Sequence, residues 1–466
     1  MNTKLPAPGH VRQNCTMLID KFIPPGASKL FSALCFVAGF SAAAQAQSYN
    51  PNPPAEIKNP PRQWIDAATG HRVIRLTDEP GSASFYFNYN PFTPDGKEMV
   101  YTKPGGIGVV NLTTLKTRTL ENAHPLRTII VGHKTPTIYY TQSVDAEAAS
   151  PEHLAVWACN IDTGETRKLV ELPPRATVVT INADETLACG SFIEGTGSAN
   201  GAYDGSQRRN AHGNFGSQNQ GEPMNKSQMM ERRLAAKLPM TMFTINLQTG
   251  QMTPLLEHNT NWLNHMQFSP TDPSLLLYCH EGMWWKVDRI WTMHTDGLAN
   301  QLVHQRTLET EIAGHEWWAA DGITIMYQLH DPKGIGSFVA SYNERTQERI
   351  WYHYDQDSSS IHHNSSPDGA LFCGDGNPEN RWIVLCRPEL NRDSSGGTLG
   401  ANLIKTGNLV AERLVNMSKD AVHNDHNYRL EPNPLFTPDM KYIIFRSNFF
   451  GPDYAFAVEV AKARQG

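Results

Sequence analysis

The sequence lacks the cysteine patterns that mark a disulfide framework or a thiolate metal site. Its seven cysteines are widely spaced, no two form a CxxC pair, and five remain after residue 46. We expect those five to be small buried apolar residues. GxGxxG and GxSxG motifs are also missing, as is any long amphipathic helical pattern. These absences argue against dinucleotide-binding and α/β-hydrolase folds.

An excess of positive charge is also missing. The chain has 40 basic and 46 acidic residues, which gives a formal net charge of −6. Such a balance provides no general attraction to nucleic acid or to anionic lipid. An anionic ligand would have to be bound by a local cluster of arginine, lysine or metal.

Long apolar runs are absent except near the start of the chain. There the run LFSALCFVAGF is too short for a spanning helix and is followed by SAAAQAQS. A lysine before the run and an Ala-x-Ala end at Ala44-Gln45-Ala46 are typical of a secretory signal peptide. We therefore predict a signal peptide over residues 1–46, no membrane span, and a periplasmic or secreted product.

The rest of the chain contains a repeated unit. Each copy has a polar or aromatic cluster, an apolar residue, a turn rich in Pro, Asp and Gly, and a short β-rich run. Seven copies are found, the second and third of them weaker, at residues 87–102, 131–141, 179–192, 263–278, 314–327, 362–375 and 430–447.

Strand pairs closed by DTG, QTG or TDG turns lie between the copies and indicate hairpins. The spacing averages about 57 residues between Asp95 and Asp439, enough for four short strands. We predict an all-β protein, a seven-bladed β-propeller over residues 56–463. The stretch from Trp64 to Leu76 and the C-terminal FAVEVAKA are expected to share one blade. A polar insertion at 195–230 is either a flexible loop or a lid.

The repeat places several polar residues at one pore mouth, because the innermost strands of a propeller all start at the same face. Histidines, a carboxylate and amides at equivalent positions are more than a turn requires. His423 and His426 lie slightly upstream of the last copy. The predicted cluster contains Asn88, Asn90, His265, His315, His362 or His363, and Glu431 with Asn433.

A site of histidine, glutamate and asparagine suits a divalent ion such as Mn²⁺, Mg²⁺ or Ca²⁺ better than zinc or copper. The sequence offers neither a thiolate ligand set nor a tight HxH pair at this position.

The chain resembles the oligogalacturonate lyases, seven-bladed propeller enzymes of pectin breakdown. The resemblance runs over most of the chain after the signal peptide. It is carried by CHEG and VDRIW within 260–297, by GHEWW within 314–322, by HHNSSPDG at 362–369 and by LEPNPLFTPDMKYIIFRSNFFG at 430–451.

This resemblance implies metal-assisted β-elimination on short α-1,4-linked galacturonides, with Mn²⁺ as the expected ion. His265 matches the family's histidine before the FSP turn and is the expected catalytic base. His315, in GHEWW, matches a metal ligand of the family.

The sequence departs from the family in two places within the site. Glu431 and Asn433 stand where the family has an HPHP-type segment, so they are the expected metal ligands beside His315, with His426 as a further one. Met240 stands close to the place of a substrate-binding arginine. Arg232, Arg233 and Arg289 are therefore the candidates to bind uronate carboxylates. Further candidates to contact the substrate are His280, His362, His363, Asn90 and Arg446.

Some alternatives stay open. His280 and Arg289, like Arg446, are either substrate contacts or parts of polar pairs inside a blade. Of Trp317 and Trp318, we expect one in the core and one lining the pore. The whole protein is either a lyase, a hydrolase on the same scaffold, or a non-catalytic, TolB-like propeller of the cell envelope that binds a ligand or partner.

Overall fold

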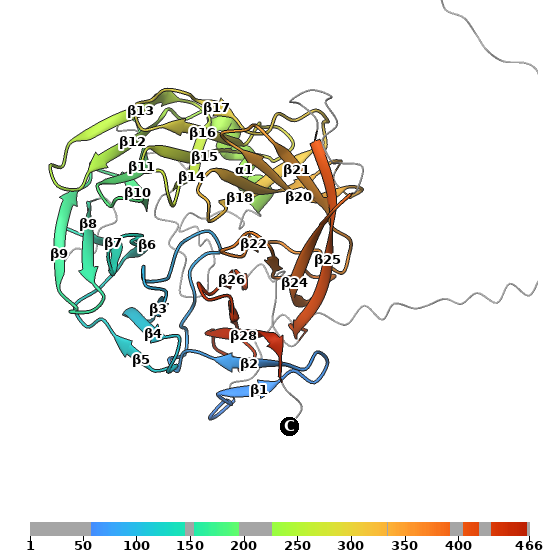
Figure 1. Cartoon of the computed structure of the whole chain (residues 1–466). Coiled ribbons are helices and arrows are strands. Elements are labelled where there is room, and N and C mark those ends of the chain that lie inside the picture. Colours follow the sequence, from blue (N-terminus) through green and yellow to red (C-terminus); the bar gives the residue numbers. More distant parts are fainter. Residues whose placement is uncertain are drawn as a thin grey trace, which may run out of the picture. The chain divides into compact units, whose positions relative to one another are not determined.

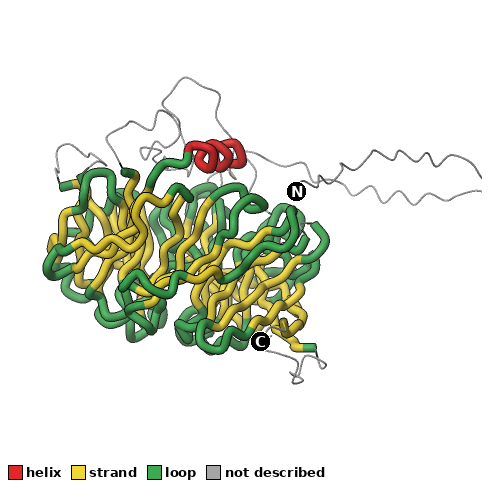
Figure 2. Tube along the Cα trace, turned by 90° about the horizontal axis from the view of Figure 1, so that it is seen from above, coloured by secondary structure: helices red, strands yellow, loops and turns green. Residues whose placement is uncertain are grey.

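The computed structural model describes residues 57–144, 153–194, 226–332, 334–391, 404–418 and 430–463. In these ranges the chain is nearly all β, as predicted, with a single helix, α1 (Lys226–Ala236). No helix among them has the length and apolar character needed to cross a membrane. The predicted signal peptide and residues 195–225 of the predicted insertion lie outside the described residues. The sheets follow one another around a circle in Figure 1, and α1 lies on one face of it in Figure 2.

Four sheets are antiparallel meanders of consecutive strands. The DTG, QTG and TDG turns close hairpins β8–β9, β12–β13 and β16–β17, as predicted. The strands are β3 (Glu98–Lys103), β4 (Gly106–Asn111) and β5 (Thr117–Thr119); β6 (Arg127–Val131), β7 (Thr137–Ser143), β8 (Leu154–Asn160) and β9 (Thr166–Glu171); β10 (Thr177–Ile181), β11 (Leu187–Ile193), β12 (Met240–Asn246) and β13 (Met252–Asn259); and β14 (Trp262–Phe268), β15 (Leu275–Glu281), β16 (Ile290–His294) and β17 (Gln301–Leu302).

A fifth sheet has eight strands in two antiparallel halves. The halves are joined by parallel pairing of β21 with β25, from Arg349 opposite Ile404 to His353 opposite Asn408. In spatial order the strands are β18 (Ile312–Trp318), β19 (Thr324–His330), β20 (Ser337–Asn343), β21 (Arg349–His353), β25 (Ile404–Asn416), β24 (Trp382–Leu390), β23 (Phe372–Gly374) and β22 (His363–Ser365).

The sixth sheet contains both ends of the described chain. β2 pairs with β28, for example Val73 with Val458, so the predicted sharing of one blade by the two ends is confirmed. In spatial order its strands are β1 (Gln63–Ile65), β2 (His71–Arg75), β28 (Tyr454–Lys462), β27 (Tyr442–Ser447) and β26 (Leu435–Phe436).

The apolar core lies between neighbouring sheets. One cluster joins Val100 of β3 to Tyr140 of β7, and another joins Leu277 of β15 to Tyr327 of β19. The middle strands of the sheets, such as β7 and β15, are therefore almost wholly buried, whereas outer strands such as β9 and β13 are polar and partly exposed. The five cysteines after residue 46 are all free and buried, as predicted. Four of them, Cys159, Cys189, Cys373 and Cys386, belong to such apolar clusters.

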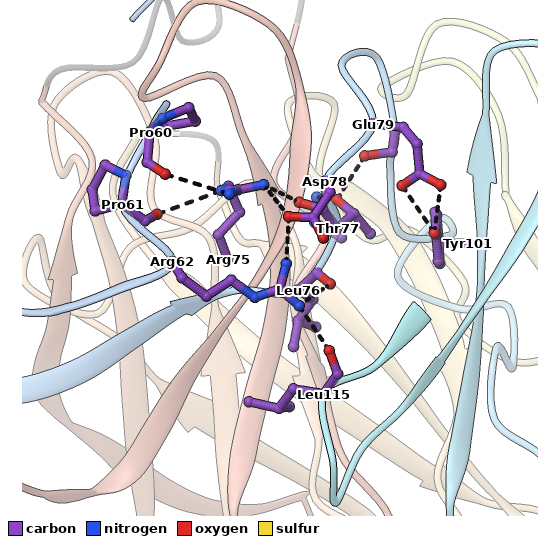
Figure 3. A network of polar contacts seen from close by, with 12 residues as sticks. Pro60, Pro61, Arg62, Arg75, Leu76, Thr77, Asp78, Glu79, Tyr101 and Leu115 are labelled. Carbon is purple, nitrogen blue, oxygen red and sulfur yellow. Dashed lines mark hydrogen bonds and ion pairs between the residues drawn. The ribbon is translucent and has the colours of Figure 1, made fainter. Parts of the chain in front are cut away.

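A polar network fixes the sixth sheet to the sheet of β3–β5 (Figure 3). Arg62 and Arg75 both donate to Asp78 Oδ1, at 2.7 and 2.8 Å, and Arg62 also donates to the Leu115 carbonyl at 2.8 Å. Arginine suits this role because its planar group donates in several directions at once. The network ties the turn after β4 to the sheet that contains both chain ends.

The repeated turns also bind one sheet to the next. Ser269 Oγ donates to the Gly322 carbonyl at 2.7 Å, and Thr271 Oγ1 donates to the Asp321 carbonyl at 3.0 Å. Gly322 has a φ of +69°, and a Cβ there would lie 2.0 Å from Thr271 Oγ1 and 2.6 Å from Ser269 Oγ. Glycine is therefore required at this turn both by backbone conformation and by space.

Replacing Gly322 by alanine should destabilise the fold more than replacing Gly369, which occupies the same turn position with a φ of +71°. The left-handed conformation costs an alanine about 1–2 kcal/mol at either site. Nothing lies within 4 Å of a Cβ at Gly369, whereas overpacking at Gly322 should add about 1–3 kcal/mol. Urea unfolding of both variants measures the difference, and equal midpoints would contradict the role given to this contact.

Candidate active site

Three predicted site residues, His265, His315 and Asn433, share an unusual backbone conformation. Their φ angles are +49°, +49° and +52°, in the left-handed region that residues other than glycine rarely adopt. His265 lies in β14 and His315 in β18, each the first strand of its sheet, and Asn433 lies just before β26. Strained backbone at matching places in three sheets points to a functional constraint.

An extra residue in each first strand accompanies this conformation. Between Asn264 and Gln267, β14 takes three steps while its partner β15 takes two. Between Gly314 and Trp317, β18 has the same excess over β19. The segment from Pro432 to Leu435 of β26 likewise has one residue more than the facing part of β27, from Arg446 to Ile444. Such β-bulges redirect side chains and are frequent beside active sites.

A tyrosine that the sequence did not single out, Tyr86, lies beside two of the predicted residues, and one of these contacts a third. The ring centroid of Tyr86 lies 5.3 Å from that of His362 and 6.4 Å from that of His265. The rings of His362 and His315 are 4.8 Å apart. The structure thus brings together three predicted imidazoles from three first-strand positions. We call these three histidines and Tyr86 the histidine cluster.

His362 is held by a buried carboxylate, Asp375. His362 Nδ1 lies 2.7 Å from Asp375 Oδ2, and the exposed fractions of the two side chains are 1% and 0%. Asp375 Oδ1 also accepts the backbone N–H groups of Ile361 and His362. On its other side His362 Nε2 lies 3.2 Å from the Tyr86 hydroxyl. A hydrogen-bonded chain therefore runs from Asp375 through His362 to Tyr86.

Gln328 orients His315. The Gln328 amide nitrogen donates to the Ser360 carbonyl and to His363 Nδ1, both at 2.9 Å. Its oxygen therefore faces His315, whose Nδ1 lies 2.6 Å away and must donate. A neutral His315 ring then carries its lone pair on Nε2, the arrangement that a metal-binding or proton-accepting imidazole needs.

His363, the alternative to His362, is completely buried behind the cluster. Its Nδ1 accepts from Gln328, and its Nε2 donates to the Ser358 carbonyl at 3.1 Å. Burial lowers the pKa of His363 to about 4. The ring is therefore neutral at physiological pH, and both nitrogens bond to the protein.

Glu281 provides a negative charge beside His265. Its carboxylate accepts a 2.5 Å hydrogen bond from the Asn264 amide and lies 4.0 Å from Arg233 on α1. Burial alone would raise the pKa of Glu281. The charges of His265 and Arg289, together with the Asn264 bond, outweigh burial and hold this pKa at about 2. Glu281 is therefore ionised and favours positive charge on its neighbours.

Two of the predicted arginines lie at this carboxylate. Arg233 also places its guanidinium 4.4 Å from the ring centre of Trp262, a cation–π contact. Arg289 is 4% exposed and donates through Nε to Glu316 at 3.2 Å. Its Nη1 is buried and makes no hydrogen bond to any other described residue. Arg289 thus combines a buried structural ion pair with one nitrogen donor that no described residue accepts from.

Other predicted residues lie apart from the histidine cluster. The ring of His280 packs 5.0 Å from that of Trp291, and burial lowers the pKa of His280 to about 4. Arg232 is exposed on α1. Asn90 caps its own turn, since its amide donates to the carbonyls of Phe92 and Val131.

Arg446 supports the segment that carries Glu431 and Asn433. Arg446 Nε donates to the Glu431 carbonyl at 2.5 Å, and its backbone N–H donates to the Pro432 carbonyl. It therefore takes part in a polar pair inside its sheet, one of the two roles expected for it. His423 and His426 lie outside the described residues.

The described residues contain no group of three His, Cys, Asp or Glu side chains arranged to hold a metal ion. The available donors still have suitable chemistry. Asn433 Oδ1 is buried without a hydrogen-bond partner among the described residues, while its amide nitrogen donates to the Glu431 carbonyl. That oxygen, the Glu431 carboxylate and His315 Nε2 are the donor types that suit a hard or borderline divalent ion.

A cavity of about 370 Å³ lies further along the same strands. No member of the histidine cluster lines it, so within the described residues it is separate from the candidate site. Trp317 and Trp318 both lie at its wall, the former 1% exposed and the latter half-buried. The wall includes the residues two positions beyond His265, His315, His362 and Asn433, which are Gln267, Trp317, Asn364 and Leu435.

The site contains three residues that sequence reasoning missed. Tyr86 comes from the aromatic stretch SFYFNYN before the first turn, where only the two asparagines were noticed. Asp375 ends the copy at 362–375, and Gln328 follows the copy at 314–327. Their only signal was a polar residue within or beside a repeat copy.

Comparisons with known proteins identify the family of the chain. A family model described as oligogalacturonate lyase matches residues 219–463, just over half of the chain. The oligogalacturonate lyase of Dickeya dadantii is 28% identical over 224 residues, and the oligogalacturonide lyase of Pectobacterium atrosepticum is 27% identical over 223. Each match covers 46% of this chain and 54% of the relative, so the chain spans about half the length of these relatives.

Two solved structures share the fold. An oligogalacturonate lyase in complex with manganese gives a TM-score of 0.66 at 20% identity, covering 88% of this chain and 99% of the other. The oligogalacturonate lyase of Vibrio parahaemolyticus gives 0.65 at 20%, covering 86% and 96%. Together with the family match, these likenesses establish that the chain belongs to the oligogalacturonate lyase family.

Proposed function

We propose that this protein is a lyase that cleaves oligogalacturonides, or related uronate oligomers, by β-elimination in pectin breakdown. Membership of the family supports this activity. The observation that carries it is the histidine cluster, in which His265 stands on a strained bulge beside the ionised Glu281. An imidazole so placed can accept a proton and be stabilised as the cation.

The chemistry requires a base and a source of positive charge. The C5 proton of a uronate is weakly acidic, so His265 removes it while nearby cations stabilise the charge that develops on the carboxylate. Arg233 lies 4.0 Å from Glu281, the carboxylate beside His265. Arg289 Nη1, which bonds to no described residue, is suited to a carboxylate oxygen. Basic side chains thus supply part of the required stabilisation.

The proposed cofactor is a divalent ion, Mn²⁺ first and Mg²⁺ or Ca²⁺ next. The manganese complex of the related lyase supports this choice, as do the donor types of His315, Glu431 and Asn433. When bound, such an ion acts as a Lewis acid on the substrate carboxylate. His315 is prepared for that role by its hydrogen bond to Gln328.

We also propose that the fold has seven blades. The two halves of the eight-stranded sheet each begin with a copy of the repeated turn, at 314–327 and 362–375. If each half is counted as one blade, the six sheets correspond to seven blades, in agreement with the seven repeat copies. An experimental structure with six or eight radial sheets would contradict this count.

The export of the protein is a further part of the proposal. When the unaltered full chain is expressed in a Gram-negative host, we expect cleavage after the Ala-x-Ala sequence. The product should be periplasmic or secreted and begin at Gln47. Intact-mass measurement of the purified protein checks this. An Ala46→Arg variant should retain the leader, and a cytoplasmic wild-type protein of full mass would refute the proposal.

His265→Ala should lower kcat on oligogalacturonate by about 10²–10⁴-fold, the usual contribution of a general base. The assay follows the ultraviolet absorbance of the 4,5-unsaturated uronate. His353→Ala, an exposed histidine on β21, is the matched control and should keep wild-type activity. Cleavage without new absorbance would indicate a hydrolase, and no cleavage of any uronate oligomer would favour a binding protein.

Gln328→Met should weaken Mn²⁺ binding by about 10–100-fold, the typical effect of losing a partner that orients a metal-binding histidine. The measurement is calorimetric titration of chelator-treated protein with Mn²⁺. Gln301→Met is the control, because Gln301 bonds to Tyr342 instead. Equal affinities for the two variants would remove His315 from the proposed metal site.

A further inference from the structure

The hydrogen-bonded series from Asp375 through His362 to Tyr86 takes part in neither the proton removal by His265 nor the proposed metal binding. If the proposed lyase activity holds, on which this inference rests, we propose that Tyr86 is the general acid that protonates the departing glycosidic oxygen. His362 and Asp375 act as positioning residues that hold the phenol at the reacting bond. Elimination needs such a donor, because the oxygen leaving C4 would otherwise depart as an alkoxide.

The position of Tyr86 suits this role. Its ring lies near those of both His362 and His265, at 5.3 and 6.4 Å between centroids, and its hydroxyl is 3.2 Å from His362 Nε2. A substrate carbon whose proton reaches His265 would therefore have a bond to oxygen within the neighbourhood of Tyr86. The acid comes from the segment between β2 and β3 and the base from β14, but both belong to one cluster.

The support of Tyr86 is unusually rigid. Asp375 accepts three hydrogen bonds, two from backbone N–H groups and one from His362 Nδ1. Both side chains are buried, so the imidazole cannot rotate without breaking the Asp375 bond. A structural tyrosine could be held by apolar packing alone. A buried carboxylate–imidazole pair is costly unless it is fully bonded, which indicates that the direction of the phenol matters.

The environment favours an acid over a base. Burial raises the pKa of Tyr86 well above its ordinary value. The phenol therefore keeps its proton at neutral pH and releases it only to a strongly basic oxygen. A departing glycosidic oxygen is such an acceptor.

The proton and electron balance closes within the cluster. The C5–H bond breaks, its proton goes to His265, and its electron pair forms the C4=C5 bond. The C4–O bond breaks with its pair on oxygen, which takes the proton of Tyr86. The resulting phenolate recovers a proton from protonated His265, directly or through water. The net change moves one proton from C5 to the leaving oxygen, and no oxidant or reductant is needed.

Tyr86→Phe removes the donor and little volume. Its product formation should fall by about 10²–10⁴-fold. In D₂O, proton removal by His265 should continue, so recovered substrate should gain deuterium at C5, measured by mass spectrometry. His265→Ala should neither eliminate nor exchange. Asp375→Asn should lower kcat at unchanged KM and retain exchange. Tyr140→Phe, a buried tyrosine on β7, is the control and should match wild type.

The outcomes separate the two proposals. A wild-type protein that forms no unsaturated product refutes the lyase proposal itself. An active wild type with an equally active Tyr86→Phe variant refutes the acid role alone. A slow Tyr86→Phe variant without C5 exchange also refutes it, because the hydroxyl would then serve only the structure. Thermal unfolding by circular dichroism confirms that each variant is folded.

Discussion

At His265, His315 and Asn433 the first strand of a sheet carries one residue more than its partner, and a positive φ absorbs the excess. Without the extra residue, alternation along the strand would continue unbroken and change the face on which each of these side chains lies. At His265 and His315 the strain is tolerated because the strand is paired with its neighbour on both sides of the bulge. The site residues thus lie at irregular positions that the regularly paired strands around them hold in place.

Charge compensation is the second requirement of this centre. Buried acids and bases come in bonded pairs, with Arg289 against Glu316 and Asp375 against His362. Glu281 differs, because His265 and both Arg233 and Arg289 act on it together. Such shared charge keeps the carboxylate ionised in a buried setting. It also means that a uronate entering the site would compete with Glu281 for the same cations.

Much of the fold and part of the site followed from the sequence. The repeats predicted an all-β chain with its ends in one sheet, and equivalent positions brought His265, His315 and His362 together. The sequence does not show on which face of a strand a side chain lies next to a bulge. The sequence therefore could not predict that Glu281 faces the cluster while its neighbour His280 packs on Trp291. Tyr86 escaped notice because it precedes the first turn motif, and only three-dimensional folding brings it beside His362.

The pairing of β2 with β28 has a consequence for how the protein matures. Strand β2, near the start of the described chain, can pair with β28 only after β28 has been synthesised, and this pairing completes the last sheet. Asn433 and Glu431 belong to that final sheet, so the complete set of cluster and donor residues exists only once synthesis has finished. A chain that ended before this last segment would lack Glu431 and Asn433, and the proposed metal site would be incomplete.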